Sequence, residues 1–273
     1  MKISPATVQE MISKILASKK YRHAGLNQDT IEALIQKEAP QHTSHKQIMK
    51  AVRTKLHNIV APYLGEPDYV SLTQELHQIE DYSLDAPQLL KFCHNVLSQH
   101  ASTAERMPLM RDFYTELFSV TGQPDSIIDL ACGLHPLGFP WMGLPNTVQY
   151  HAYDILQPRI DFINSFFNKL GLAPLAENRD ILINPPSQQA DLGIFFKEAH
   201  RFEKRQPGCN QAFWESLNVA TLAVSLPTKS LTGSHHLLDS HRNLVHENLP
   251  QHRKISEIKI GNEIIFLIKK KAD

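Results

Sequence analysis

Apolar residues recur at helical spacing through the first hundred residues of the chain. Val8, Ile12 and Ile15 fall on one side of a helix, as a period of about 3.6 residues requires. Ser4 and Asn27 suit helix starts because their side chains accept a hydrogen bond from an otherwise unpaired backbone N–H. No strand pattern precedes residue 125, so this part is predicted to be all-helical. Five helices are expected in it, at 4–20, from Asn27, from Thr43 or Ser44, at about 69–80 and at about 86–100.

From residue 125 onward, apolar strand patterns alternate with helical ones. This alternation predicts a mostly parallel sheet with helices on both faces. The expected strands are SIIDLA (126–131), VQYHAYD (148–154), a short strand near 178–183, DLGIFFK (191–197) and TLAVSLP (221–227), with helices at 158–170 and around 209–217.

The chain ends in RKISEIKI-GN-EIIFLIKKK, where Gly261-Asn262 separates two alternating apolar runs. This pattern is a β-hairpin signal. A Rossmann-like sheet that finishes in an antiparallel hairpin is the layout of class I methyltransferases that use S-adenosylmethionine (SAM). The predicted fold is therefore an α/β, class I SAM-methyltransferase sheet preceded by an all-helical N-terminal domain.

The composition sets limits on the class of protein. The 273 residues fit one large domain plus a smaller one, and a hydrophobic content of 42% with 21% charged residues supports a packed core. No apolar run approaches the ~20 residues of a membrane span, and the N-terminus lacks a signal-peptide core, so a cytoplasmic protein without membrane contact is expected. Cys93, Cys132 and Cys209 are far apart, and the 15 histidines form no HExxH motif and no i,i+4 pair with an acid on one helix. His235, His236, His241 and His246 cluster in the C-terminal third, where a metal site is the alternative to scattered surface histidines. No metal site is expected.

Basic residues concentrate at the N-terminal end of a chain whose net charge is zero. Residues 1–60 hold ten Lys or Arg against four Asp or Glu, whereas residues 61–100 hold one Lys against six acids. A surplus of this size on three helices is typical of a polyanion-docking face. An ordinary solvated helix surface is the alternative.

A cofactor motif lies where the first expected strand ends. Asp129 closes the apolar run, and Ala131-Cys132-Gly133 forms a small-residue turn that leaves backbone room for a cofactor. Asp154 follows Gly133 by 21 residues, near the position where a nucleotide-binding βαβ unit places its ribose ligand. NAD would need G-x-G-x-x-G, which is absent here. SAM has no phosphates and needs one close backbone approach, so the motif favours SAM, with Asp154 at the ribose and Asp180 at the adenine.

A second motif leaves an alternative open. Asn184-Pro185-Pro186-Ser187 resembles the loop with which amine methyltransferases grip an amino group through the Asn side chain and a proline carbonyl. Ser187 replaces the stacking aromatic residue of that loop. The stretch is interpreted as a turn, and an amine-directed enzyme remains the alternative.

Six stretches run in order along almost the whole chain: SKKYR (18–22), VRTKLHNIVAPY (52–63), HASTAER (100–106), DLACGLHPLGFPWMGLP (129–145), SLPTKSL (225–231) and IGNEIIFLIKK (260–270). Together they resemble the 16S ribosomal RNA guanine-N7 methyltransferases that confer aminoglycoside resistance (the Rmt, ArmA and Sgm type). The resemblance implies methyl transfer from SAM to a guanine in the decoding A site (helix 44) of 16S rRNA within the 30S subunit. It also implies a docking domain at 1–104 and a methyltransferase domain at 105–273.

The resemblance also assigns roles to residues. Arg106 matches an arginine that binds the SAM carboxylate, and Lys197 and Ser225 are expected beside the methyl acceptor as catalytic residues. Phe139, Trp141 and the Ser225–Lys229 segment are candidates for holding a flipped base, although core packing is the more ordinary role for the two aromatic residues. The SAM pocket is expected to comprise Arg106, Asp129, Ala131, Gly133, Asp154, Ile155, Asp180 and Ile181. The RNA contacts are expected to comprise Lys20, Arg22, Arg53, Lys55, His57 and Lys229.

The chain departs from the family pattern at three places. His135 stands where the family usually has Asn, the segment EAHRFEKRQPG (198–208) replaces an apolar one, and the 232–243 segment lacks the family's basic Gly-Met and Asn-Tyr residues. A retargeted RNA methyltransferase, or a SAM- or rRNA-binding homologue with weak or lost activity, is therefore a further alternative.

Overall fold

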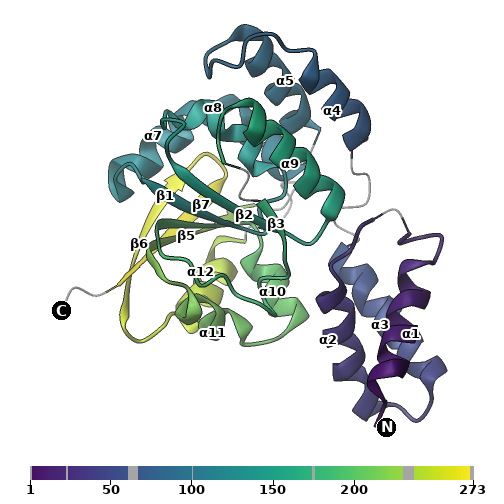
Figure 1. Ribbon diagram of the computed structural model, residues 1–273. Helices are drawn as coiled ribbons and strands as arrows, with labels where there is room; N and C mark the ends of the chain where they lie inside the picture. The colour runs from purple at the N-terminus through teal and green to yellow at the C-terminus, as the bar shows by residue number, and fades with distance from the viewer. Residues whose placement is uncertain are drawn as a thin grey trace.

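The computed structural model describes residues 2–22, 24–60, 67–99, 101–173, 176–229 and 237–270. Three helices form a separate N-terminal bundle, α1 (Pro5–Leu16), α2 (Gln28–Glu38) and α3 (His45–Val60). The predicted caps are confirmed: the side chains of Ser4 and Asn27 accept from the N–H groups of Thr7 and Thr30 at the starts of α1 and α2. Figure 1 places this bundle at the lower right, beside the sheet.

The bundle has its own apolar core. Ile15, Ile31 and Val52 are completely buried in it. Leu156, from the loop after the second strand, belongs to the same hydrophobic cluster. The bundle is therefore seated on the sheet-bearing part of the chain at that loop.

A seven-stranded sheet forms the centre of the molecule, in the order β3-β2-β1-β4-β5-β7-β6. The first five strands pair in parallel, and β7 runs antiparallel to both β5 and β6. This order is that of the class I methyltransferase sheet, so the predicted fold class is confirmed. The strands are β1 (Ser126–Leu130), β2 (Gln149–Asp154), β3 (Ala176–Asn178), β4 (Ala190–Phe196), β5 (Val219–Pro227), β6 (Arg253–Ile260) and β7 (Glu263–Lys270).

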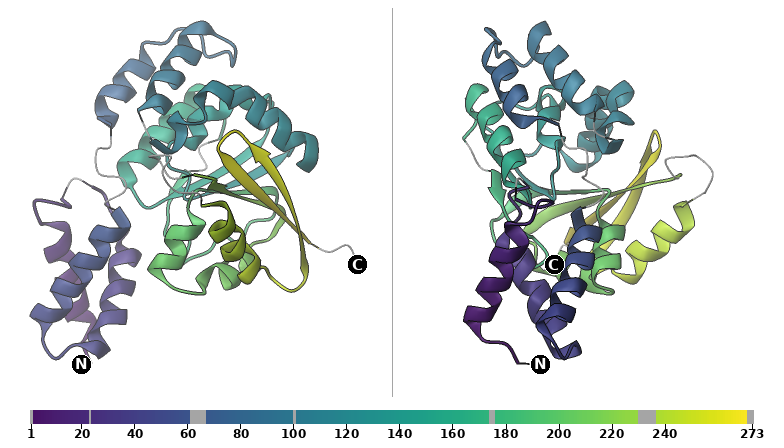
Figure 2. Two further views of the ribbon diagram at one scale, coloured as in Figure 1. Left: turned by 180° about the vertical axis from the view of Figure 1, so that it is seen from behind. Right: turned by 90° about the vertical axis from the view of Figure 1, so that its right-hand side faces the viewer.

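Helices cover both faces of the sheet, as the two views of Figure 2 also show. Successive strand residues point to opposite faces, so Ile127 joins one hydrophobic cluster and Ile128 the other. The first face is covered by α4 (Tyr69–His77), α5 (Pro87–Ser98), α7 (Met110–Thr121), α8 (Phe139–Met142) and α9 (Gln157–Lys169); the second is covered by α10 (Ala199–Arg205), α11 (Cys209–Ser216) and α12 (Leu238–Glu247).

Four short helical segments complete the described structure: η1 (Ala39–Gln41), α6 (Ala101–Ala104), η3 (Met107–Leu109) and η4 (His135–Gly138). Helices α4 and α5 share a hydrophobic cluster with the sheet and not with the α1–α3 bundle. The domain boundary after residue 104 stays a prediction. The packing shows that only α1–α3 have a separate hydrophobic cluster among the N-terminal helices of the described residues.

The structure corrects one predicted element. The short strand expected near 178–183 lies earlier, at Ala176–Asn178, and 181–184 form a turn. The Ile183 and Asn184 N–H groups both donate to the Asp180 carbonyl, which turns the chain away from the sheet. Helices α6, α7, α8, α10 and α12 are not among the predicted elements.

Polar contacts attach the bundle to the carboxyl edge of the sheet. The Asn27 side-chain amide donates to Asn178 Oδ1 at 2.8 Å, and Thr30 Oγ1 donates to Asp180 Oδ2 at 2.7 Å. The Gln157 N–H donates to the Gly25 carbonyl, next to an isolated bridge between Leu26 and Leu156. The bundle is thereby held against the loops that follow β2 and β3.

Among the described helices, none combines the length and the apolar character needed to cross a membrane. The described residues also contain no cluster of three or more His, Cys, Asp or Glu side chains placed to hold a metal ion.

Candidate functional site

The loop after β1 turns sharply at two residues in the left-handed region. Ala131 has φ +53° and Gly133 has φ +55°, and an alanine at positive φ is uncommon. A Cβ at Gly133 would meet no atom within 4 Å. The backbone therefore faces open space at Gly133, as a loop that admits a cofactor requires.

Asp154, the last residue of β2, is bonded to this loop. Its Oδ2 accepts from the Gly133 N–H at 3.1 Å and from Arg159 Nη1 at 2.6 Å, and its Oδ1 accepts from the Leu156 N–H at 3.0 Å. A carboxylate offers about four acceptor sites, so one site remains for a ligand hydroxyl. The 21-residue spacing thus brings Asp154 and Gly133 into direct contact.

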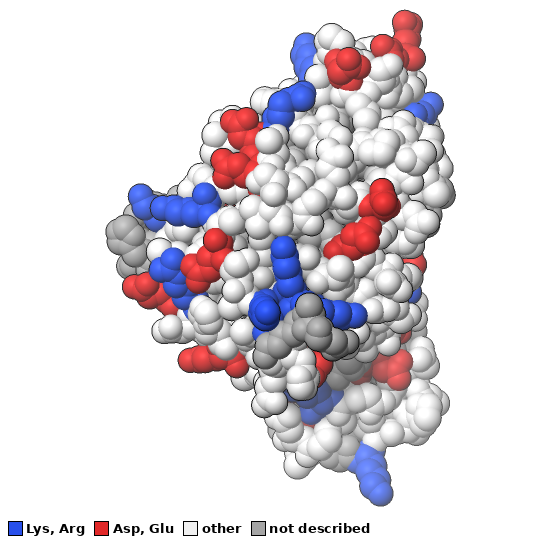
Figure 3. Space-filling view, turned by 90° about the vertical axis from the view of Figure 1, so that its left-hand side faces the viewer, with Lys and Arg blue, Asp and Glu red and all other residues white. Residues whose placement is uncertain are grey.

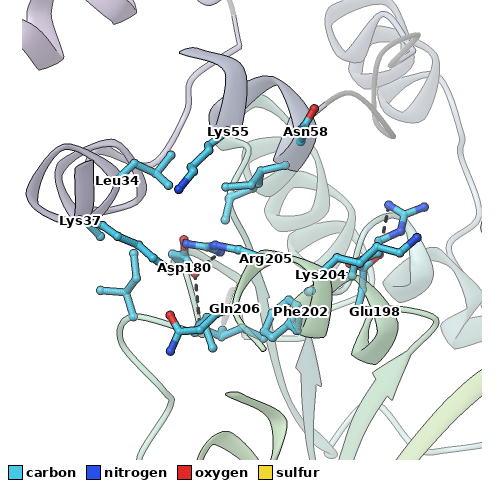
Figure 4. Close-up of a pocket in the computed structure, with 18 of the residues that line it drawn as sticks. Leu34, Lys37, Lys55, Asn58, Asp180, Glu198, Phe202, Lys204, Arg205 and Gln206 are labelled. Carbon is cyan, nitrogen blue, oxygen red and sulfur yellow. Dashed lines mark hydrogen bonds and ion pairs between the residues drawn. The ribbon is translucent and has the colours of Figure 1, made fainter. Parts of the chain in front are cut away.

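A cleft of about 1040 Å³ opens where the carboxyl ends of β1, β2 and β4 meet the α1–α3 bundle. Five of the predicted cofactor residues line it: Ala131, Asp154, Ile155, Asp180 and Ile181. Leu34 and Lys37 of α2 also line the cleft, and Phe202 and Arg205 of α10 line the side that faces them (Figure 4). The volume suits a nucleoside-sized ligand.

Asp180 lies in the cleft with its carboxylate fully engaged. Arg205 binds both oxygens, at 3.0 and 2.5 Å, while Thr30 Oγ1 and the Leu182 N–H add one bond each. Asp180 therefore links three elements, α2, the loop after β3, and α10. An adenine amino group would have to replace one of these donors.

Asp129 lies beneath the loop in a buried polar network. Its Oδ2 accepts from Tyr150 Oη at 2.8 Å and contacts His135 Nδ1 at 2.7 Å, and His135 Nε2 contacts Tyr114 Oη at 2.7 Å. Asp129 does not line the cleft. His135, which stands where the family usually has Asn, therefore links Asp129 to Tyr114 beneath the loop that follows β1.

A second charged cluster joins Arg106, Lys197 and Glu263. Arg106 donates from Nε and Nη2 to the two Glu263 oxygens at 3.1 and 2.7 Å, and Lys197 Nζ lies 3.4 Å from Glu263 Oε1. The rings of Phe113 and Phe196 lie 4.1 and 4.6 Å from the Arg106 guanidinium carbon. The Arg106 side chain, predicted to bind the SAM carboxylate, is thus held by two rings and one carboxylate.

Glu263 lies in the IGNEIIFLIKK stretch, and no role was predicted for it from the sequence. Glu263 is buried, and burial on its own would raise the pKa of its carboxyl; the Arg106 and Lys197 charges outweigh burial and lower this pKa to about 2. The available signal was an acid directly after a hairpin turn, at the head of an otherwise apolar strand. The terminal hairpin thus supplies, besides two strands, the buried carboxylate that pairs with Arg106 and Lys197.

Lys197 and Ser225 meet at the ends of β4 and β5. Lys197 has φ +60°, and its N–H donates to the Ser225 carbonyl at 2.8 Å. Its Nζ also contacts the Ser102 carbonyl at 2.9 Å and Glu105 Oε2 at 3.0 Å. Residues of the HASTAER, DLGIFFK and SLPTKSL stretches are therefore neighbours in space.

Similarity to known proteins decides the family. A family model described as "Ribosomal RNA methyltransferase (FmrO)" matches residues 17–267. The chain belongs to the FmrO family of ribosomal RNA methyltransferases.

Individual proteins match nearly the full chain. It is 34% identical over 265 residues to a 16S rRNA (guanine(1405)-N(7))-methyltransferase of Serratia marcescens, covering 96% of this chain and 98% of that one. The solved structure of the 16S rRNA methylase RmtB superposes with a TM-score of 0.80 at 30% identity, covering 98% of this chain and all of RmtB. The 16S rRNA methyltransferase RmtF, solved with S-adenosylhomocysteine, shares the fold with a TM-score of 0.78 at 22% identity, covering 99% of this chain and all of RmtF.

This FmrO-family chain carries its predicted RNA contacts in two groups. Lys20 Nζ lies 2.6 Å from His57 Nδ1 and 5.5 Å from the centre of the Tyr21 ring. Burial raises the pKa of Tyr21, and the nearby Arg53 charge partly opposes this rise. These residues, together with the exposed Arg22, belong to the α1–α3 bundle. Lys55 instead pairs with the buried Glu38 and lines the cleft, and Lys229 is exposed after β5.

Charge is distributed differently on the face turned away from the bundle. Acidic and basic side chains are interspersed over most of that face, with one group of basic side chains near its centre (Figure 3).

The amine-methyltransferase alternative receives no support from the position of Asn184. Asn184 is exposed, its side-chain amide donates to Asp29 Oδ2 at 2.8 Å, and it does not line the cleft. The NPPS stretch therefore braces α2 from outside the site. In the divergent 232–243 segment, residues 232–236 lie outside the described residues, and 238–243 belong to α12.

Phe139 is completely buried, and Trp141 packs partly buried against the same apolar cluster. The core role that sequence reasoning gave as the ordinary one fits this packing.

Proposed function

We propose that this protein transfers the methyl group of SAM to N7 of the guanine in 16S rRNA for which its named relatives are specific. The observation that carries the proposal is the cleft at the carboxyl edge of a class I methyltransferase sheet, lined by Ala131 and Asp154, in a chain of the FmrO family. The Gly133 N–H donates to Asp154 from the adjoining loop.

SAM fits the residues that line the cleft. Asp154 keeps one acceptor site, and Ile155 and Ile181 offer apolar surface to a purine. Gly133, in the adjoining loop, leaves open space beside its Cα. SAM supplies a methyl group on a positively charged sulfur. Asp154 would accept from the ribose, and Asp180 would accept from the adenine amino group in place of Thr30 or Arg205.

Arg106 and Lys197 would bind the far end of the cofactor and the entering base. The Arg106 guanidinium lies against two aromatic rings outside the cleft lining, and its Nε and Nη2 donate to Glu263. A cofactor carboxylate would take its remaining donors or displace Glu263. Lys197 and Ser225 lie where β4 and β5 end, which is the edge at which ligands bind in such sheets.

The chemistry asks the protein for alignment. Guanine N7 carries a free lone pair and no proton, so no general base is needed. When the N7–carbon bond forms, the carbon–sulfur bond breaks and its electron pair returns to sulfur, so the positive charge moves to the purine. The residues of the cleft act by holding N7 and the methyl carbon in line and by accommodating a base that has left its stack.

The basic bundle would dock on the ribosome. Lys20, Arg22, Arg53 and His57 would contact phosphates, which position a protein on RNA without specifying sequence. In this proposal, residues 1–104 serve docking and 105–273 serve methyl transfer in the cytoplasm, on the 30S subunit. Expression would then give resistance to gentamicin and kanamycin.

Labelled methyl transfer tests the substrate. With tritiated SAM, we expect incorporation near one methyl per particle into 30S subunits, and little into naked 16S RNA or 50S subunits. A chain that binds S-adenosylhomocysteine and 30S subunits but transfers no methyl group would be the inactive homologue. Equal transfer to all three substrates would mean that the target is different.

A further inference from the structure

Both walls of the cleft are lined by basic side chains. Lys37 and Lys55 come from the α1–α3 bundle, and Arg201, Lys204 and Arg205 come from α10. Figure 4 shows Lys37 and Lys55 on one side of the opening and Lys204 and Arg205 on the other. Basic side chains of the bundle and of α10 therefore lie on opposite sides of the cleft.

The cofactor does not account for this charge. The cleft lining holds three carboxylates, on Asp154, Asp180 and Glu198, and each has an arginine partner. SAM carries a sulfonium, an ammonium and one carboxylate, so it is itself a net cation. Additional cations around it raise its energy at close range, which indicates that the basic side chains serve an anionic ligand.

Two of these cations have no local counter-ion in the described part of the structure. Lys37 and Lys204 are exposed, and no ion pair joins either of them to a carboxylate of the described residues. Lys204 lies close enough to act on its neighbours: burial, and then the charges of Arg201, His241 and Lys204, lower the pKa of His200 to about 4. His200 is therefore neutral at physiological pH. The remaining charged side chains of α10 are three cations, Arg201, Lys204 and Arg205, and one carboxylate, Glu203.

The position of α10 connects it to the reaction. α10 begins two residues after Lys197, at the end of β4. It lies within the 198–208 segment, in which the sequence departs from the family's apolar pattern. A cation here is next to the edge of the sheet where the target base would enter.

We propose that Lys204 and Arg201 of α10, together with Lys37 of α2, form a phosphate-binding strip across the mouth of the cleft that holds the rRNA backbone beside the target guanine. The inference rests on the proposed function, because the polyanion it names is the RNA substrate of that site. Point charges on lysine suit phosphate without reading sequence, so the strip contributes affinity and position, and the reacting purine is selected elsewhere.

The experiment measures binding of the full-length protein to fluorescently labelled 30S subunits across a series of salt concentrations. We compare Lys37→Ala, Lys204→Ala and their double variant with Lys91→Ala, an exposed lysine on α5. Each cleft substitution is expected to weaken binding by about 3- to 10-fold and to reduce the slope of log K against log salt by about one. Affinity for S-adenosylhomocysteine, measured by calorimetry, should stay within about twofold, which also verifies folding.

Three outcomes would overturn the strip. Unchanged 30S affinity and slope in the double variant, while the wild type binds, would overturn it and leave the proposed function standing. An equal loss in Lys91→Ala would show a general charge effect and overturn it as well. If the wild-type protein binds no 30S subunits, the proposed function fails and the strip fails with it.

Discussion

Replacing Asp154 by asparagine is expected to weaken binding of S-adenosylhomocysteine by about 10- to 100-fold and to reduce methyl transfer accordingly. A hydrogen bond to a charged group contributes about 1.5–3 kcal/mol, and Asp154 is the carboxylate that the cleft offers to a ribose. The neutral side chain also loosens the Gly133 loop, because Asp154 Oδ2 accepts from the Gly133 N–H. Calorimetric titration with S-adenosylhomocysteine measures the effect.

Stability must be measured in parallel because Asp154 also pairs with Arg159, which is completely buried. Removing one partner of a buried ion pair costs about 3–5 kcal/mol, so the variant is titrated well below its own Tm. Asn184→Ala is the matched control: Asn184 is exposed and contacts Asp29 outside the cleft. Near-normal affinity in Asp154→Asn, or a collapse of turnover in Asn184→Ala, would contradict the site as described.

The second large effect is expected at Glu263, where glutamine should lower the Tm by about 6–15 °C. Glu263 is the buried carboxylate shared by Arg106 and Lys197, and its loss leaves two neighbouring cations poorly compensated. A cost of about 3–5 kcal/mol corresponds to a shift of that size in a chain of this length. Glu105→Gln is the control, because Glu105 contacts Lys197 with 29% of its side chain exposed, and such pairs contribute about 0–1 kcal/mol.

The pH dependence of this effect has a defined sign. The pKa of Glu263 falls from its usual 4.5 to about 2 in the folded protein, so the folded state holds its proton less tightly than the unfolded state. The stabilisation is therefore complete above about pH 4.5 and is lost as the pH falls toward 2. Unfolding by urea at several pH values measures it, and the Glu263→Gln variant should lack this component. Equal Tm shifts for Glu263→Gln and Glu105→Gln would contradict the assignment.

Sequence patterns predicted the features that depend on local spacing. Ser4 and Asn27 predict helix starts, and Gly261-Asn262 predicts the terminal hairpin. The 21-residue separation of Gly133 and Asp154 predicts that they lie at the ends of adjacent strands. Each of these signals is confined to one or two neighbouring elements, whose geometry the backbone period determines.

Contacts between distant segments were not predictable in the same way. Asp180 pairs with Arg205 and Thr30, and Glu263 pairs with Arg106. These partners lie far apart in the sequence, and the tertiary fold brings them together. The strand near 178–183 was misplaced because Ile181 and Ile183 have strand-like residue types, whereas the Asp180 carbonyl closes a turn there. The roles of His135 and of the cations on α10 likewise depend on three-dimensional neighbours.

The position of the methyl group on 16S rRNA tests the proposed function most directly. After incubation of 30S subunits with the protein and SAM, the 16S rRNA is reduced and cleaved at N7-methylguanine and then mapped by primer extension. We expect one new stop, at the 16S rRNA guanine that the names of the relatives specify, and a much weaker stop when Asp154→Asn is used at the same SAM concentration. A stop at a different nucleotide, or incorporation of methyl without any stop, would contradict the proposed function.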